Sequence, residues 1–148
     1  MAINWALIKF DDLTALELYK IMQLRNEVFV VEQNCVYQDA DNKDIEGFHF
    51  MGWEDDKLVA YTRLLPPGLS YTEPSIGRVV TSPSARKSGL GRELMIQSID
   101  RIQKIYGELP IKIGAQFYLK KFYASLGFEQ TSDIYLEDNI EHIEMVKS

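Results

Sequence analysis

The segment from Arg86 to Gly91 combines two cations with two glycines at the expected start of an apolar helix. The first turn of a helix has backbone N–H groups without intrahelical partners and carries a partial positive charge. Gly89 and Gly91 lack a Cβ, so a ligand can approach this backbone closely. Arg86 and Lys87 add full positive charges beside it. The pattern predicts a binding site for a diphosphate group.

Two common phosphate-binding motifs do not fit this segment. The Walker A pattern needs Gly-x4-Gly-Lys-Ser/Thr, which is absent. The dinucleotide fingerprint needs a third glycine, where this chain has Leu94. It also has an acid after the next strand, where this chain has residues 114–116, Gly-Ala-Gln. An unrelated nucleotide-binding domain is therefore disfavoured.

The charge of the chain is unevenly distributed. The formal net charge is −6, yet residues 76–92 contain four cations and no acid. A negative protein is poorly suited to nonspecific binding of nucleic acid or anionic membranes. Charge alone would fit a solvated basic loop, but together with the glycines it favours a specific anionic ligand.

The hydrophobic pattern predicts a mixed sheet of mostly antiparallel strands flanked by helices, an α+β fold. Thr14 and Glu17 form a capping-box pair at the start of the first helix, and Gly127 is placed to end the last one. The predicted helices cover residues 14–30, 89–107 and 116–126. The predicted strands cover residues 5–10, 47–54, 58–66, 75–81 and 111–114, followed by a hairpin over 129–138 and 142–147.

Composition predicts a single cytoplasmic domain over residues 1–148. The length suits one hydrophobic core. No stretch approaches the roughly 20 apolar residues that cross a bilayer, and the N-terminus lacks the basic region of a signal peptide. The single cysteine, Cys35, builds no disulfide framework and fits a reducing compartment.

Two motifs resemble those of the GNAT acetyltransferases. The segment RVVTSPSARKSGLGRELM resembles motif A, with Arg86, Gly89 and Gly91 on the positions Arg/Gln-x-x-Gly-x-Gly/Ala. The segment GAQFYLKKFYASLGF resembles motif B, including its ending from Phe122 to Phe128. The segments LRNEVFVVEQNCVYQDADNKD and YLEDNIEHIEM are similar to the ElaA-like subfamily. Two positions depart from the usual pattern: Gln116, where Asn is frequent, and Leu119, where Ala is common.

The resemblance implies the GNAT acyl-CoA N-acyltransferase fold, in which two central strands splay apart at the coenzyme A site. The pantetheine arm of acetyl-CoA would insert into this gap and bond to strand backbone. Main-chain groups left unpaired by the splay need such a partner. The residues expected to bind acetyl-CoA are Val79, Val80, Thr81, Arg86, Lys87, Ser88, Gly89, Leu90, Gly91, Arg92, Gln116 and Phe122.

The implied reaction is transfer of the acetyl group from acetyl-CoA to an amine, by direct attack. Motif B assigns Tyr123 as the general acid for the departing thiolate. A tyrosine has a pKa of about 10 and a thiol of about 8.5, so tyrosine stays protonated at neutral pH yet can supply a proton. A backbone N–H near Val80 could polarise the thioester carbonyl.

The general base stays open between several candidates. The candidates are Glu32, His49 and Glu73, each of which could take the proton of the amine directly or through a water molecule. A histidine pKa near 6.5 suits base chemistry, but a structural role is favoured for His49. His142 is equally ambiguous. Cys35 offers an alternative route, since a cysteine nucleophile would form an acyl-enzyme.

Residues 30–46 carry a local charge of −4 and are expected to form the wall of the acceptor site. Such a wall would attract a cationic amine: a polyamine, an amino sugar, or a lysyl or N-terminal amine. Neutralising Asp39, Asp41 and Asp44 should then raise the KM for the acceptor. The three aspartates lack the glycine and the distal glutamate of a calcium loop, so no metal is expected.

An acyl-CoA sensor or partner-binding module of the same fold, without catalysis, is the alternative function. The presence of Tyr123 favours the enzyme, because a pure binder needs no proton donor there. The expected partners are acetyl-CoA and a small or peptidyl amine, without nucleic acid or membrane. The protein would be a monomer or a homodimer.

Overall fold

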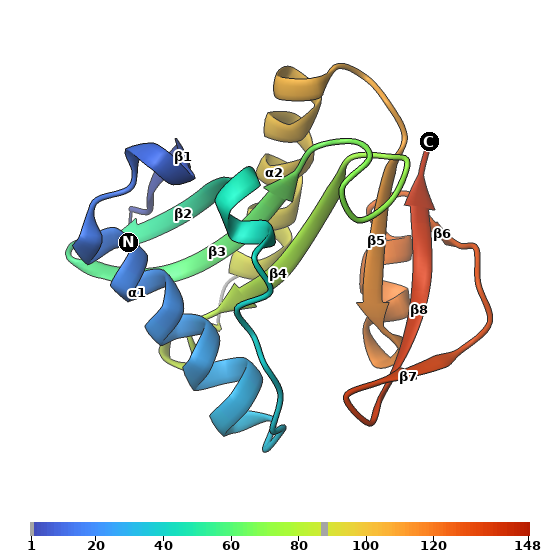
Figure 1. Cartoon of the computed structure of the whole chain (residues 1–148), viewed down its shortest axis with the longest axis horizontal. Helices are drawn as coiled ribbons and strands as arrows, with labels where there is room; N and C mark the ends of the chain where they lie inside the picture. The colour runs from blue at the N-terminus through green and yellow to red at the C-terminus, as the bar shows by residue number, and fades with distance from the viewer. Residues whose placement is uncertain (1, 87–88) are drawn as a thin grey trace.

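The computed structural model describes residues 2–86 and 89–148 as an open eight-stranded sheet with helices on both faces (Figure 1). The strands are β1 (Asn4–Lys9), β2 (Phe48–Glu54), β3 (Lys57–Leu65), β4 (Ser75–Thr81), β5 (Ile111–Gln116), β6 (Phe128–Gln130), β7 (Tyr135–Glu137) and β8 (Ile140–Lys147). The α-helices are α1 (Ala15–Arg25), α2 (Leu90–Tyr106) and α3 (Lys120–Ala124). None of the helices formed by the described residues is long and apolar enough to cross a membrane.

The sheet order is β1-β2-β3-β4-β5-β8-β6, with β7 also paired to β8. All neighbouring strands are antiparallel except β4 and β5, which confirms the predicted mixed sheet. These two parallel strands pair at a single register position, Ser75 with Lys112. From that point they diverge into a V, which is visible in Figure 1. The backbone between the arms of the V therefore has free hydrogen-bonding groups.

The two faces of the sheet are covered by different helices. Met95 and Ile102 of α2 pack on Ile111 and Ile113 of β5 in one core cluster, which also contains Tyr123 of α3. Ile21 and Leu24 of α1 pack on Met51 and Tyr61 of β2 and β3 in another. Because side chains alternate along a strand, the even-numbered residues of β5 point away from the α2–α3 core.

A β-bulge interrupts β4 at the point where the V opens. Gly77 pairs with Arg63 and Val80 pairs with Tyr61, so two residues of β4 face one residue of β3. Arg78 in the bulge has a φ of +48°, a left-handed conformation that a bulky residue adopts only when its surroundings hold it. Bulges redirect a strand and leave backbone groups unpaired.

The predicted elements are largely confirmed, with three corrections. The strand predicted over 111–114 extends to Gln116, so the last α-helix, predicted from 116, begins only at Lys120, after a 3-10 turn over Phe117–Leu119. The capping box of Thr14 and Glu17 is present, α2 ends before Gly107, and Gly127 has the expected positive φ of +99°. The first helix, however, continues after Arg25 as a π-helix over Asn26–Glu32. The segment predicted as one strand over 129–138 is split into β6 and β7. Ser132 leaves the ladder there, and its hydroxyl accepts the Glu144 N–H that a strand partner would otherwise bind.

Candidate active site

A cavity of about 850 Å³ fills the opening between β4 and β5. One wall comes from the π-helical segment and the chain after it, from Val28 to Gln38. The opposite wall comes from β7, β8 and the turn between them. The floor comes from both splayed strands and from α3. The lining from these two strands consists of Ser75, Ile76, Gly77, Arg78, Val79, Val80, Thr81, Ile113, Gly114 and Gln116.

The β4 side of the cavity exposes main-chain groups that have no partner on β5. Val79, Val80 and Thr81, expected to bind acetyl-CoA, line it and lie beyond the one paired position of β4 and β5. Gly77 also lines it, and a Cβ there would meet no described atom within 4 Å. Main-chain N–H and C=O groups of this strand can therefore form hydrogen bonds with the amides of a ligand.

The start of α2 lies at one end of the cavity. Gly89 occupies the N-cap position with a φ of +74°, and no side chain caps the helix within the described residues. Gly91 lines the cavity, and a Cβ on it would likewise meet no described atom within 4 Å. Packing therefore gives no reason for a glycine at position 91, whereas close approach of a ligand does. Lys87 and Ser88, also predicted to bind the ligand, lie outside the described residues.

Arg86 binds Glu32 across the mouth of the cavity. The guanidinium makes a bidentate ion pair, with 2.8 Å between Arg86 Nη1 and Glu32 Oε2. The hydrogen bond from Arg86 lowers the pKa of Glu32 below its ordinary value. A carboxylate with a lowered pKa is a poor proton acceptor. Glu32 lines the cavity but its environment does not suit a general base.

Two other predicted ligand contacts lie elsewhere. Leu90 is buried in a core cluster with Phe50 and Leu94, and Arg92 donates a hydrogen bond to Ser125 at 2.8 Å. Neither residue lines the cavity. Both side chains are thus engaged with the protein, because helical spacing turns them away from the face that Gly91 presents.

Tyr123 and Phe122 lie at the inner end of the cavity. Both line it, and their rings pack edge to face with centroids 5.1 Å apart. Burial raises the pKa of Tyr123 above its ordinary value, so the hydroxyl stays protonated at neutral pH. No described residue forms a hydrogen bond with this hydroxyl. Tyr123 can therefore donate its proton to a ligand.

His49, a predicted base candidate, is a structural residue. It is fully buried and does not line the cavity. Its Nε2 lies 2.9 Å from the carbonyl oxygen of Asp44, which can only accept, so Nε2 carries the hydrogen. Its Nδ1 must then accept the hydrogen bond from the Tyr61 hydroxyl at 2.6 Å. The lone pair that a base needs is already occupied. Glu73, the third candidate, also lies off the cavity.

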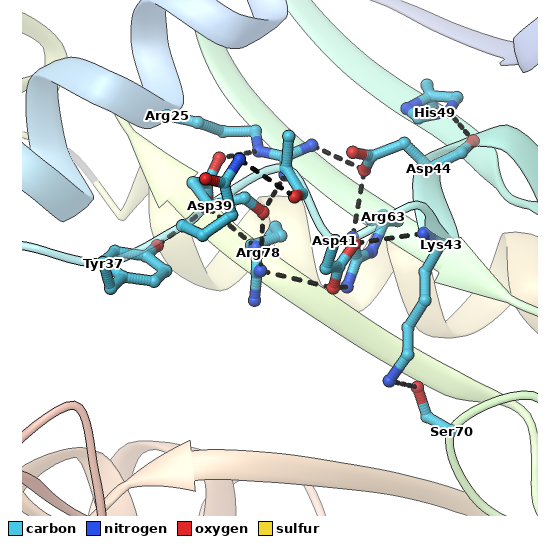
Figure 2. Close-up of polar contacts among 12 residues, drawn as sticks. Arg25, Tyr37, Asp39, Asp41, Lys43, Asp44, His49, Arg63, Ser70 and Arg78 are labelled. Carbon is cyan, nitrogen blue, oxygen red and sulfur yellow. Dashed lines mark hydrogen bonds and ion pairs between the residues drawn. The ribbon is translucent and has the colours of Figure 1, made fainter.

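The predicted acidic wall is instead half of a buried ion-pair network, the arginine–aspartate cluster formed by three arginines and three aspartates (Figure 2). Arg25, whose side chain is fully buried, contacts Asp39 at 2.8 Å and Asp44 at 2.7 Å. Arg63 contacts Asp41 at 2.8 Å and Asp44 at 3.0 Å. The members of the cluster are Arg25, Asp39, Asp41, Asp44, Arg63 and Arg78.

Three arginine charges offset the three aspartate charges, so the prediction that this segment attracts a cationic amine is wrong. Of the three aspartates only Asp41 lines the cavity. The network does hold the bulge of β4, because Arg78 lies 2.9 Å from the Asp39 carboxylate and donates to the Asp39 carbonyl at 2.9 Å. Its role is to fix the loop and the strained Arg78 backbone beside the cavity.

Two tyrosines of the cavity, Tyr71 and Tyr135, were not predicted from the sequence. His142, Tyr71 and Tyr135 all line the cavity, although they come from β8, from the loop before β4, and from β7. The side-chain amides of Gln116 and Gln33 meet across the opening at 3.4 Å, and the Cys35 thiol donates to the Asp138 carbonyl at 3.5 Å. Among the described residues, no group of three or more His, Cys, Asp or Glu side chains is arranged to hold a metal ion.

Comparison with known proteins agrees with this geometry. A family model described as an acetyltransferase (GNAT) domain matches residues 16–148. The protein ElaA of Escherichia coli is 40% identical over 147 residues, covering 98% of this chain and 96% of the relative. Its crystal structure superimposes with a TM-score of 0.93, covering 99% of this chain and all of that one.

Two further structures support the assignment of the fold. The structure of an acyl-CoA N-acyltransferase from Pseudomonas aeruginosa has a TM-score of 0.94 and 41% identity, covering 99% of this chain and all of that one. An aminoglycoside 6′-N-acetyltransferase in complex with coenzyme A shares only the fold, with a TM-score of 0.71, 17% identity and 96% of each chain covered. The family model and the Escherichia coli relative both extend over nearly the whole sequence, and the chain therefore belongs to the GNAT acetyltransferase family, in its ElaA-like group.

Proposed function

We propose that the protein transfers the acetyl group of acetyl-CoA to a primary amine, by direct attack within a ternary complex. The observation that carries this proposal is the continuous cavity between β4 and β5. It joins the start of α2, which no described side chain caps, to the hydroxyl of Tyr123 and is bordered on one side by strand backbone beyond the last β4–β5 pairing.

The cavity offers a suitable group for each part of acetyl-CoA. The unpaired N–H groups at the start of α2, with Arg86 beside them, suit the pyrophosphate. The main chain of Val79 to Thr81 suits the amides of the pantetheine arm. Phe122 adds apolar surface at the inner end. Acetyl-CoA itself supplies the reactive thioester.

The chemistry assigned to this chain is proton supply and charge stabilisation. A backbone N–H at the bulge, near Val80, can donate to the thioester oxygen as negative charge develops. Tyr123 remains protonated at neutral pH and can give its proton to the departing thiolate. These roles need no metal ion.

The release of free thiol from acetyl-CoA tests this proposal directly. The assay uses Nα-acetyl-lysine amide, spermidine and glucosamine as acceptors, and calorimetry measures acetyl-CoA binding in parallel. Amine-dependent thiol release supports the acetyltransferase. Tight acetyl-CoA binding without release from any amine would instead favour the catalytically inactive acyl-CoA sensor.

Replacing Glu32 should strengthen acetyl-CoA binding. The Glu32→Gln variant removes the ion pair of Arg86. The guanidinium can then bind the pyrophosphate without first breaking its contact with the Glu32 carboxylate. Exposed ion pairs are weak, so we expect the Kd for acetyl-CoA to fall about two- to fivefold. Calorimetry at low salt measures this. Glu129→Gln on β6 removes the same charge from an exposed site and should leave the Kd unchanged; equal Kd values for all three proteins would contradict the exchange of partners.

Replacing Cys35 should leave catalysis intact. Its thiol lines the cavity but already donates to the Asp138 carbonyl, and direct transfer requires no acyl-enzyme. We expect Cys35→Ser to keep the wild-type kcat and to show intersecting double-reciprocal plots, as a ternary complex does. Parallel plots in the wild type, together with loss of activity in this variant, would establish the cysteine route instead.

A further inference from the structure

Gly114 lines the cavity from β5, on the side of the sheet away from the α2–α3 core. It is exposed, although its neighbours Ile113 and Ala115 are buried. A Cβ on Gly114 would lie 3.0 Å from the Tyr71 hydroxyl and 3.3 Å from the Tyr135 hydroxyl. The glycine therefore makes room for two hydroxyl groups, which border the cavity space beside it.

The surroundings of this space already bind one primary ammonium group. Lys112 Nζ lies 4.9 Å from the ring centroid of Tyr71 and 3.1 Å from the Glu144 carboxylate. Ring faces and carboxylates both attract cations. Glu137 lines the cavity and adds a second carboxylate, whose one ionic contact among the described residues is with the ring of His142. The lining therefore suits a second ammonium group.

His142 presents one ring nitrogen to the same cavity. The residue is 8% exposed and its ring stacks on Tyr135, with centroids 5.9 Å apart. Its Nδ1 lies 2.7 Å from the carbonyl oxygen of Ile140, so Nδ1 carries the hydrogen. In the neutral ring Nε2 therefore holds the lone pair, and it lies 3.6 Å from the Glu137 carboxylate, which can pair with the ring once it is protonated. This arrangement is the reverse of that at His49, where the lone pair is occupied.

We infer that the acceptor is a cationic primary amine, whose ammonium group binds in the cavity beside Tyr71, Tyr135 and Glu137 and gives its proton to Nε2 of His142. This inference rests on the proposed acetyl transfer. The Glu137 carboxylate stabilises the imidazolium that forms.

The proton balance of the reaction follows from these positions. One ammonium proton passes to His142, and the free nitrogen lone pair forms the bond to the acetyl carbon as the carbon–sulfur bond breaks. The thiolate takes a proton from Tyr123 and leaves as free thiol. The nitrogen loses a second proton as the amide forms. This proton passes through solvent to Tyr123 and restores its hydroxyl. His142 releases its own proton to solvent, so the net products are the amide, free coenzyme A and one proton.

Two variants test the site in different ways. Gly114→Ala puts a methyl group against the Tyr71 and Tyr135 hydroxyls and displaces them, so the KM for the amine should rise about tenfold, the effect of roughly one lost contact. His142→Asn keeps a donor for the Ile140 carbonyl but removes the Nε2 lone pair, so kcat should fall about 100-fold. Both should bind acetyl-CoA with the wild-type Kd. Glu141→Gln, on the opposite face of β8, is the matched control.

The pH dependence separates a base from a merely structural histidine. The titratable groups that face His142 are Tyr135 and Glu137, and Gln116 is its register partner on β5. A lysine-like amine has a pKa of about 10.4, so at high pH more of it arrives already deprotonated. The kcat deficit of His142→Asn should therefore shrink between pH 7 and pH 9.

The outcomes distinguish this inference from the proposed function. If the wild type acetylates Nα-acetyl-lysine amide or another amine of the panel while both variants behave like Glu141→Gln, the acceptor site lies elsewhere and the acetyltransferase stands. A deficit of His142→Asn that stays constant with pH would overturn the base role. If the wild type acetylates no amine, both the proposed function and this inference fail.

Discussion

The Tyr123→Phe variant is expected to lose most of its kcat while binding acetyl-CoA as tightly as the wild type. The substitution removes only the hydroxyl, and the ring keeps its packing against Phe122 and Phe128. A positioned general acid contributes roughly 10²–10⁴-fold to a rate. We therefore expect kcat to fall by about two orders of magnitude or more, as measured by thiol release at saturating substrates.

The control for this variant is Tyr19→Phe, which removes the hydroxyl of an exposed tyrosine on α1. Its kcat should equal that of the wild type. A wild-type kcat in Tyr123→Phe would show that the thiolate takes its proton from another source, such as water.

The second large effect is expected on stability, at Arg25. The Arg25→Met variant preserves much of the side-chain volume but leaves Asp39 and Asp44 with one arginine partner each. Removing one partner of a buried ion pair costs about 3–5 kcal/mol, because a charge is left buried without compensation. We expect the free energy of unfolding to fall by about this amount in denaturant titrations.

The acid sensitivity of the wild type should have the same origin. Burial opposes ionisation of Asp41 and Asp44, but the hydrogen bonds and charges of the arginines outweigh it and lower both pKa values. A carboxylate with a lowered pKa in the folded state contributes stability above the ordinary value, about 3.9, and that stability is lost as the pH falls through the lower value. The wild type should therefore lose stability below about pH 4.

Asp100→Asn provides the matched control for the cluster. It breaks the exposed ion pair with Lys104 on α2. Because exposed ion pairs contribute less than about 1 kcal/mol to stability, the free energy of unfolding should change by no more than that. An unfolding free energy of Arg25→Met that is as high as that of Asp100→Asn would mean that the cluster does not hold the loop and the bulge in place.

The sequence predicted the elements that local chemistry determines. The capping box at Thr14 and Glu17, the glycines at positions 89 and 127, and the apolar repeat of α2 each act within a few residues, and each was confirmed. The alternation of strands and helices was also enough to predict a mixed sheet. The splay of β4 and β5 followed from the resemblance to a family, because no local pattern encodes a missing strand pairing.

The partners of charged side chains could not be predicted in the same way. Arg25 and Asp39 are 14 positions apart, and Arg78 and Asp39 are 39 apart. An aspartate in a loop has the same sequence signal whether it attracts a substrate or neutralises a distant arginine. The two histidines are a similar case. Both lie on strands, and only their hydrogen-bond partners distinguish them: Nδ1 of His49 accepts from a hydroxyl, whereas Nδ1 of His142 donates to a carbonyl.

A crystal structure with saturating acetyl-CoA tests the central claim most directly. We predict that the pantetheine arm lies between β4 and β5 and bonds to the main chain of Val79 to Thr81. The pyrophosphate should contact the backbone at Gly91, and the sulfur should lie within hydrogen-bonding distance of the Tyr123 hydroxyl. A structure in which acetyl-CoA binds outside this opening, or in which β4 and β5 pair along their length, would contradict the account.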